Sequence, residues 1–311
     1  MLAPASRLGY ARSRAQGGVQ GKRRFAGDRY AAWLLPLPAA LVTAVLIVFP
    51  IAFLLYMGFC QWFFESASTW RWVGLENYIA LVTDSRFVGA LWHTLYFAAL
   101  GLVIQIPLGI LIALLFHQEF PGRGLMRTLL LLPMVATPVA MALVWVMMLD
   151  PGMGVIRYLL GTIGVASPAW LSNPNTVIPT LVMVDSWEWT PLVALMCLSG
   201  LAALPTEPFE AALLDGASPW TRFWYLTLPM LRPTLVIAIV FRVIDLLKVV
   251  DIIYVMTRGG PGFSSETLNV YDFFVGLFYY QIGYGSAIAV VLFALVLGVT
   301  LLLMRVRRAT W

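Results

Sequence analysis

Six long apolar runs constrain this chain more than any other feature of its sequence. They lie at roughly 32–60, 89–117, 127–149, 175–203, 233–256 and 283–305. Each is long enough to cross a bilayer, because a spanning helix needs about 20 mostly apolar residues. Only 11% of the residues are charged, against roughly 25% in soluble domains. The runs therefore predict an all-α membrane protein with six transmembrane helices.

The Lys and Arg residues outside these runs predict how the chain is oriented. Most of them fall in residues 1–29, in the second and fourth intervals between runs, and after residue 304. Positive residues are enriched on the cytoplasmic side of membrane proteins. We therefore expect a multi-pass protein of the cell inner (plasma) membrane with both termini in the cytoplasm. Residues 1–29 form the N-terminal tail, 30–305 the transmembrane domain and 306–311 the C-terminal tail.

Several functional classes are disfavoured by motifs that the chain lacks. It has no G-x-x-x-x-G-K-[ST] phosphate loop and no H-E-x-x-H sequence, so neither ATP binding by that loop nor a zinc-protease site is expected. His93 and His117 lie at opposite ends of the second run and cannot form a metal site together. The net charge of +5 is spread over the ends of the runs, which disfavours nucleic-acid binding. The chain is not expected to be an enzyme.

Two aromatic clusters lie in intervals expected outside the cell, WFFESASTWRW (62–72) and YDFFVGLFYY (271–280). Aromatic residues of this kind usually form the belt at the membrane–water interface. We expect that role for both clusters, with docking of a partner as the alternative.

A polar stretch, EAALLDGASPW (210–220), interrupts the apolar sequence in the fourth interval. Thr206 can cap a first helix, which Gly216 would end because glycine accepts the left-handed conformation at helix ends. Ser218 can cap a second helix that stops near Pro229. The apolar anchors of this element are expected to be Phe209, Leu213, Phe223 and Leu226. Such an element could dock a partner or lie on the bilayer as an amphipathic loop, and the pattern leaves both open.

The fifth run contains Arg242, Asp245, Lys248 and Asp251, each three residues from the next. A charge inside a spanning helix costs about 2.5–3.5 kcal/mol on insertion scales and marks a functional site by default. Residues three apart are neighbours on a helix. The alternating signs therefore predict either a ladder of structural ion pairs or a polar wall of a substrate pathway.

The fourth run adds DSWEWTP (185–191), which carries two carboxylates and two indoles. Carboxylates accept hydrogen bonds from hydroxyl groups, and indole faces stack on the C–H surfaces of sugars. Glu188 and Trp189 are therefore candidates for contacts to a polyhydroxylated solute.

Two stretches resemble the permease subunits of ABC importers. The first follows the spacing of their EAA loop with Glu210, Ala211, Ala212, Asp215, Gly216, Ala217, Leu228 and Pro229. The second, DIIYVMTRGGPG (251–262), resembles the end of the fifth span and the next outer loop of carbohydrate-uptake permeases, which include the maltose and glycerol-phosphate transporter subunits. The resemblance covers roughly residues 30–305. The short outer intervals depart from the large maltose permease subunit, so its inserted periplasmic domain is not expected here.

This resemblance implies a type I ABC importer permease architecture, with a cytoplasmic coupling helix in the EAA loop at about 204–232. The implied partners are a second six-span permease, a dimer of ATP-binding ATPase subunits, an extracytoplasmic solute-binding protein, a carbohydrate-like small molecule and membrane lipid. No cofactor is implied in this chain, because ATP and Mg²⁺ would be bound by the partner ATPase. By comparison with the maltose permease, sugar-contacting positions fall at or near Glu188, Trp189, Leu192, Lys248 and Val249.

We therefore expect the permease subunit of an ATP-driven, binding-protein-dependent importer for a sugar or related polyhydroxylated solute. The expected pathway residues are Glu188, Trp189, Leu192, Asp245, Lys248, Val249 and Asp251. The alternative is an ion-coupled secondary transporter that uses the charged fifth run as a relay. Such transporters usually contain internal repeats, and none is evident in the sequence.

Overall fold

A computed structural model describes residues 35–63 and 70–308 of the chain. The chain forms two compact units, residues 1–51 and 52–311. The expected N-terminal tail, 1–29, lies outside the described residues. Helix α2 (Leu37–Met57) begins in the first unit and continues into the second. All of its residues up to Ile51 are exposed, which suits a helix surrounded by lipid.

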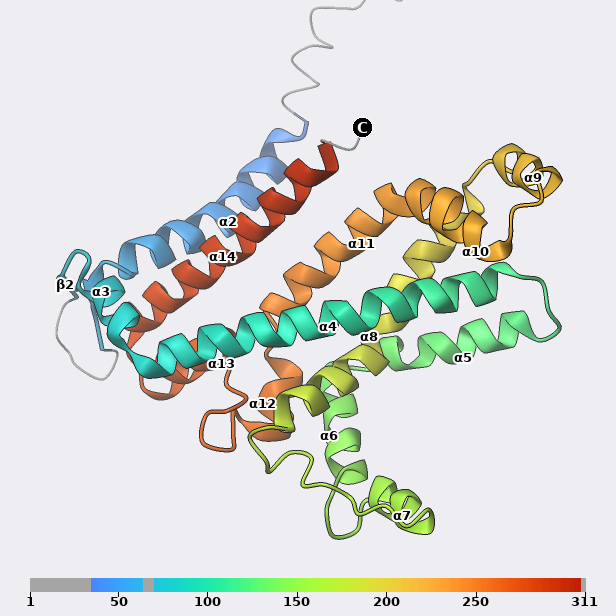
Figure 1. Cartoon of the computed structure of the whole chain (residues 1–311). Coiled ribbons are helices and arrows are strands. Elements are labelled where there is room, and N and C mark those ends of the chain that lie inside the picture. The colour runs from blue at the N-terminus through green and yellow to red at the C-terminus, as the bar shows by residue number, and fades with distance from the viewer. Residues whose placement is uncertain (1–34, 64–69, 309–311) are drawn as a thin grey trace, which may run out of the picture. The chain divides into compact units, whose positions relative to one another are not determined.

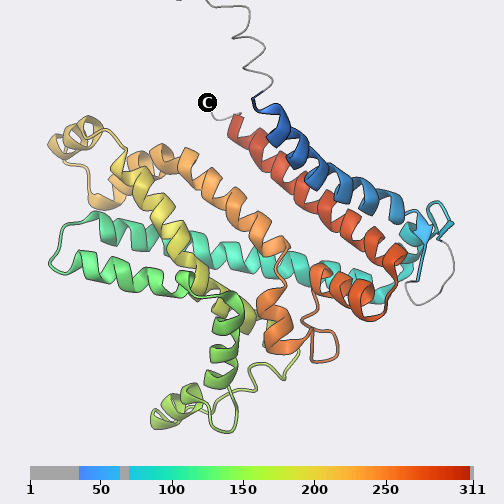
Figure 2. The ribbon, with the colours of Figure 1, turned by 180° about the vertical axis from the view of Figure 1, so that it is seen from behind.

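The second unit is mostly helical, with a small hairpin near its start (Figures 1 and 2). In the hairpin, β1 (Cys60–Gln61) pairs antiparallel with β2 (Arg71–Trp72). The α-helices that follow are α3 (Glu76–Thr83), α4 (Ser85–His117), α5 (Arg123–Val135), α6 (Pro138–Met148), α7 (Val155–Thr162), α8 (Val177–Ala202), α9 (Glu207–Leu214), α10 (Pro219–Arg222), α11 (Leu228–Leu247), α12 (Asp251–Thr257), α13 (Leu268–Phe273) and α14 (Ile282–Arg308). Two π-helical turns, η1 (Phe223–Thr227) and η2 (Phe274–Phe278), extend α10 and α13.

Among the described residues, four helices are long and apolar enough to cross a membrane: α2, α4, α8 and α14. Helices α5 and α6 qualify together as a fifth, although they meet at a bend of 97°. Helix α11 is 20 residues long but carries Arg232, Arg242 and Asp245, and it is not among the qualifying helices. The helical class is confirmed with four or five apolar spans, where the sequence predicted six.

The bend between α5 and α6 follows from Pro138. The residue before a proline is driven out of the α region, and Thr137 is extended with ψ of 137°. Pro138 then begins α6, where its missing N–H is tolerated. The third predicted span, 127–149, is therefore two helices rather than one kinked helix.

The fifth predicted span, 233–256, is also not one helix. Helix α11 ends at Leu247 and α12 begins at Asp251, which leaves residues 248–250 outside both. The carbonyl of Lys248 accepts a hydrogen bond from the side-chain amide of Asn269, and the carbonyl of Val249 accepts one from the Thr267 hydroxyl at 3.5 Å. These side chains replace helical partners, which allows the backbone to leave the helix inside the protein.

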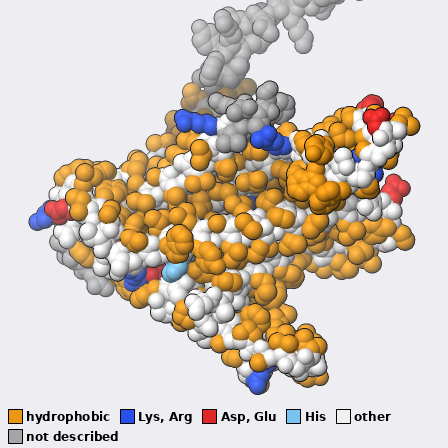
Figure 3. Space-filling view, in the orientation of Figure 1, with side chains coloured by type: hydrophobic (Ala, Val, Ile, Leu, Met, Phe, Trp, Pro, Cys, Tyr) orange, Lys and Arg blue, Asp and Glu red, His pale blue; other side chains and the backbone are white. Residues whose placement is uncertain are grey.

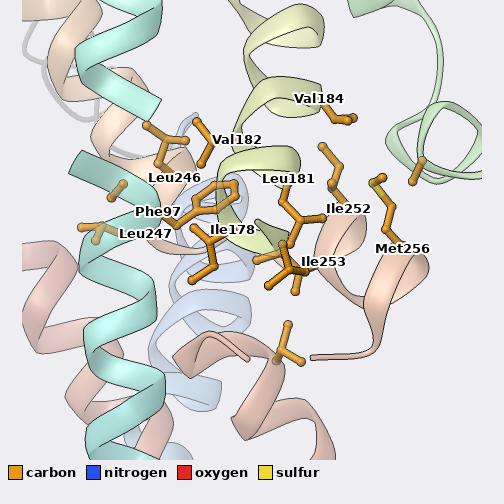
Figure 4. Close-up of a cluster of buried hydrophobic side chains, with 14 of the residues drawn as sticks. Phe97, Ile178, Leu181, Val182, Val184, Leu246, Leu247, Ile252, Ile253 and Met256 are labelled. Carbon is orange, nitrogen blue, oxygen red and sulfur yellow. The ribbon is translucent and has the colours of Figure 1, made fainter. Parts of the chain in front are cut away.

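The largest hydrophobic cluster lies where α4, α8, α11 and α12 meet (Figure 4). Phe97 of α4 packs with Ile178 and Leu181 of α8, Leu246 of α11 and Ile253 of α12. All five side chains are at most 5% exposed. The cluster fixes these helices against each other around the polar residues described below.

Glycines let the backbones approach closely beside this cluster. A Cβ atom at Gly109 of α4 would lie 2.4 Å from Cγ1 of Val193 of α8, and one at Gly200 of α8 would lie 2.7 Å from Cδ1 of Leu231 of α11. Small residues at such crossings are typical of membrane helix packing, where close van der Waals contact supplies the attraction.

The N-terminal end of α4 is tied to the segments around α13. Asp84 accepts hydrogen bonds from the hydroxyls of Tyr271 and Tyr284 at 2.6 and 2.9 Å. Burial raises the pKa of the Asp84 carboxyl, but these hydrogen bonds outweigh it and hold the pKa below its usual value. Arg86 forms a two-pronged ion pair with the buried Glu266, with both N–O distances at 2.7 Å. Tyr271, expected in an interfacial belt, is instead a buried anchor for these contacts.

Candidate functional site

The loop expected to couple to a partner contains the short helix α9, and none of its residues is buried. Helix α9 ends in a Schellman motif, in which the N–H of Ala217 bonds the carbonyl of Ala212 at 2.9 Å and the N–H of Gly216 bonds that of Leu213 at 3.1 Å. Gly216 has φ of +75°, which glycine accepts without strain. The sequence prediction that Gly216 ends this helix is therefore confirmed.

The surface of α9 is acidic and apolar at once. Glu210, Ala211 and Asp215 are exposed, and Leu214 is 90% exposed. On the face drawn in Figure 3, hydrophobic side chains cover most of the molecule, and acidic side chains gather near the far end of α9. The α9 segment therefore exposes leucine side chains directly beside carboxylates.

Two predictions about the first helix of this loop, α9, are wrong. Thr206 occupies the position before α9, but its side chain makes no capping hydrogen bond, because its backbone is already helical with φ −81° and ψ −28°. Leu213 was expected as an anchor and is 55% exposed. Ser218 does cap α10, since its hydroxyl accepts a hydrogen bond from the N–H of Thr221 at 3.1 Å.

The second helix of the loop does not stop near Pro229, as the sequence predicted. It passes from α10 through η1 directly into α11, which begins at Leu228. Pro229 lies in the first turn of α11, where η1 changes the hydrogen-bond partners and a missing N–H costs little. The coupling candidates Leu228 and Pro229 therefore lie at the start of a long helix.

Arg242 of α11 belongs to a buried cluster that joins three helices. Arg242 is 1% exposed and donates to Asp185 of α8 at 2.7 Å and to the side-chain oxygen of Gln105 of α4 at 2.7 Å. Gln105 in turn donates to Asp185 at 2.6 Å. The three side chains form a closed ring of hydrogen bonds, which fixes α4, α8 and α11 at this level.

The predicted ladder along the fifth run is only partly present. Asp245 lies 3.7 Å from Arg242 and 3.3 Å from Lys248, so its two rungs exist. Asp251 forms no ion pair with any residue in 35–63 or 70–308, because the break after Leu247 moves it to the first turn of α12. The main partner of Arg242 is Asp185 from another helix, which spacing along one helix could not predict.

Glu188 lies near the middle of α8 and is completely buried. Neither of its carboxylate oxygens has a hydrogen-bond partner within the described part of the chain. Asp185, Arg242 and Asp251 are the charged groups that act on it electrostatically. A buried carboxylate without a partner is costly, so Glu188 marks a place where an added hydroxyl or other donor would be stabilised.

The other predicted pathway residues differ in burial and in how close they lie to Arg242. The ring of Trp189 is half-buried and lies 5.4 Å from the Arg242 guanidinium carbon. Leu192 and Val249 are half-buried, whereas Lys248 and Asp251 are exposed. The structure thus brings Glu188, Trp189 and Asp245 close to Arg242, and leaves Lys248 and Asp251 at the surface.

A cavity of about 540 Å³ borders the opposite side of α8, between α4 and α5. Trp187 and Thr190 of α8 line it together with Pro133 of α5. The hydroxyl of Thr190 is buried and has no hydrogen-bond partner among the described residues. Polar atoms without hydrogen-bond partners among the described residues therefore lie on both sides of α8, at Glu188 and at Thr190.

Sequence reasoning missed two buried polar residues that join distant segments of the chain. Gln105 is a lone amide inside the apolar second run, a signal that it has a buried polar partner. Glu266 follows the glycine-rich segment after α12 and is 1% exposed. Its partner Arg86 is 180 positions earlier in the sequence, so the pair could not be predicted from local spacing.

Residues 105–309 match the family described as binding-protein-dependent transport system inner membrane component. The chain belongs to this family. It is 36% identical over 239 residues to a trehalose/maltose transport system permease of Thermococcus litoralis, with 76% of this chain and 80% of the relative covered. It is also 36% identical over 283 residues to a sulfoquinovosyl glycerol transport system permease of Agrobacterium fabrum, with 91% and 92% covered.

The fold agrees with the family assignment. A permease chain of a bacterial ABC transporter that imports the acidic polysaccharide alginate superposes with a TM-score of 0.80. The match covers 91% of this chain and 96% of that chain, at 22% sequence identity. This family member is therefore a membrane transport component with the fold of ABC importer permeases.

Proposed function

We propose that the chain is the transmembrane permease subunit of an ATP-driven, binding-protein-dependent importer for a sugar or related polyhydroxylated solute. It forms half of the translocation pathway and couples to the ATPase through α9. The observation that carries the coupling role is α9 itself. It is a helix with no buried residue, ended sharply at Gly216, and it exposes Leu213 and Leu214 beside Glu210. Such a surface needs a partner to cover it.

The proposed substrate class rests on the relatives and on α8. Both curated relatives named above are permeases for glycosides or sugars. Glu188 supplies a buried carboxylate without a partner, and Trp189 beside it supplies an aromatic face. A solute with several hydroxyl groups would satisfy the carboxylate and stack on the indole.

The partners follow from the same proposal. A second six-span permease would close the pathway, because four or five apolar spans enclose a channel poorly. Two ATPase subunits would bind ATP and Mg²⁺, and an extracytoplasmic solute-binding protein would deliver the solute. In this arrangement α9 lies on the cytoplasmic side and both termini are cytoplasmic. The family assignment disfavours the ion-coupled alternative.

The coupling role is tested by Glu210→Lys combined with Gly216→Pro in the reconstituted complex. Proline cannot adopt φ of +75°, so the end of α9 is displaced, and lysine reverses the charge of its surface. We expect ATP-dependent uptake to be abolished while the helical circular dichroism signal is kept. Glu119→Lys, an exposed residue in the neighbouring interval between α4 and α5, is the matched control and should transport normally. Full ATP-coupled uptake by the double variant would refute the coupling role.

The substrate site is tested by Trp189→Ala, which removes the aromatic face next to Arg242. A truncated partner in a hydrogen-bonded, stacked site costs about 1–3 kcal/mol, or roughly ten- to hundred-fold in apparent affinity. We expect that loss in uptake of the polyhydroxylated solute, measured as a rise in the half-saturating concentration. Assembly of the complex and its basal ATPase activity should survive. Unchanged uptake kinetics would contradict this site and leave the importer role standing.

A further inference from the structure

A second cavity lies beneath the α9 loop, away from the substrate site. Its volume is about 680 Å³, within the roughly 300–1,000 Å³ typical of small-molecule sites. The ends of α4 and α8 form one wall, and the segment after α8, α9, α10 and η1 form the other. It is therefore bounded both by helices that fix the fold and by the loop proposed to move with the ATPase.

The polar lining of this cavity includes one arginine, Arg222, and one histidine, His117. The Nε atom of Arg222 is buried and has no hydrogen-bond partner among the described residues, and Arg222 forms no ion pair in 35–63 or 70–308. A guanidinium group in this state lacks the acceptor that it binds best, a phosphate or a carboxylate.

The remaining lining is apolar and aromatic. Leu111, Leu201, Phe209 and Phe223 line the cavity with Trp220, which is 69% exposed. The rings of Trp220, Phe223 and Trp224 contact one another at centroid distances of 5.2–6.0 Å. Exposed tryptophans of this kind settle at the headgroup level of a bilayer. A free phosphate would leave these apolar walls uncovered, whereas an acyl chain covers them.

We propose that this cavity binds one anionic phospholipid from the leaflet on the α9 side. Its phosphate pairs with Arg222, and part of an acyl chain packs against Leu111 and Leu201. Because one lipid contacts α4, α8 and α10 together, its occupancy stabilises the loop in its present position. The assignment of that leaflet to the cytoplasmic face rests on the proposed function, whereas the lipid site itself does not.

The test uses the full chain in nanodiscs of phosphatidylcholine that contain a small, increasing fraction of phosphatidylglycerol with brominated acyl chains. Bromine quenches nearby tryptophan fluorescence. We expect saturable quenching with brominated phosphatidylglycerol, and no saturable quenching with brominated phosphatidylcholine. Trp220→Phe combined with Trp224→Phe, which removes both tryptophans of this ring cluster, should remove most of the saturable signal and so assign it to this cavity. Equal quenching by both lipids would overturn the proposal.

Two variants separate the headgroup contact from the acyl-chain contact. Arg222→Gln should weaken phosphatidylglycerol binding about ten-fold, because a charge-assisted hydrogen bond is lost, while Arg232→Gln, an exposed arginine outside the cavity, should leave it unchanged. Ala202→Phe, on the cavity wall, should block binding by filling the space without changing the charge. If Arg222→Gln fails to fold, unimpaired lipid binding by Ala202→Phe still refutes the proposal.

A competition experiment with free glycerol phosphate completes the test. It should not displace the brominated lipid at concentrations where the lipid is saturating. Displacement would identify a site for small anions and overturn the lipid assignment. No step of this test uses ATP or transport, so a failed lipid site and a failed importer role remain distinguishable.

Discussion

The charged residues of α9 and those around Arg242 have opposite surroundings. Arg242, Asp185 and Gln105 are buried and pair with one another, whereas Glu210 and Asp215 are exposed. A buried charge is costly unless the chain supplies its partner. An exposed charge needs no internal partner and is free to meet another protein. The first group therefore holds helices together inside the protein, and the second leaves an exposed surface that fits the proposed coupling role.

The largest effect should come from Arg242→Met, which removes the positive charge of the buried cluster. It leaves Asp185 buried without its counter-ion, and breaking such a pair costs about 3–5 kcal/mol. We expect a lower yield and a lower melting temperature of the detergent-solubilised protein. Adding Asp185→Leu should recover much of the loss, because both charges are then gone. An unchanged melting temperature in the single variant would show that the cluster does not hold the helices.

Gln105→Leu should have a smaller effect on the same cluster. The ion pair between Arg242 and Asp185 remains, but one acceptor and one donor of the ring are lost. An unmade buried hydrogen bond costs about 1–3 kcal/mol, which thermal unfolding of the purified protein would detect. Ser199→Ala, an exposed position on α8, is a control that should melt normally. A loss as large as that of Arg242→Met would mean that the ring, not the ion pair, carries the stability.

Lys248→Ala should have the smallest effect on stability. The lysine side chain is 56% exposed and its partner Asp245 is 36% exposed, and exposed pairs contribute about 0–1 kcal/mol. If Lys248 lines the pathway, the variant should melt normally and lose uptake. A clear drop in melting temperature would instead show that Lys248 stabilises the buried cluster, and the contrast between buried and exposed charges would be weaker than described.

What the sequence could predict depended on how local each signal was. The predictions for Gly216 and Ser218 are correct because a left-handed glycine and a capping serine act on a few neighbouring residues. The equally local prediction for Thr206 is wrong because its backbone is already helical. The ladder from Arg242 to Asp251 was extended too far because the break at 248–250 depends on Asn269 and Thr267, which belong to a distant segment. Gln105 stood out as a polar residue, but its partners come from α8 and α11 and could not be read from one helix. The roles of the coupling and pathway residues remain predictions.

The unbroken helical path from Pro219 through η1 to Leu247 has a mechanical consequence. At 1.5 Å per residue this helical path is roughly 40 Å long, with one end at the exposed loop and the other just past Arg242. A displacement of α10 is therefore passed along one helical path to the level of the buried cluster. The non-helical residues 248–250 lie immediately beyond, so a rotation of this path can be absorbed there and need not move α12.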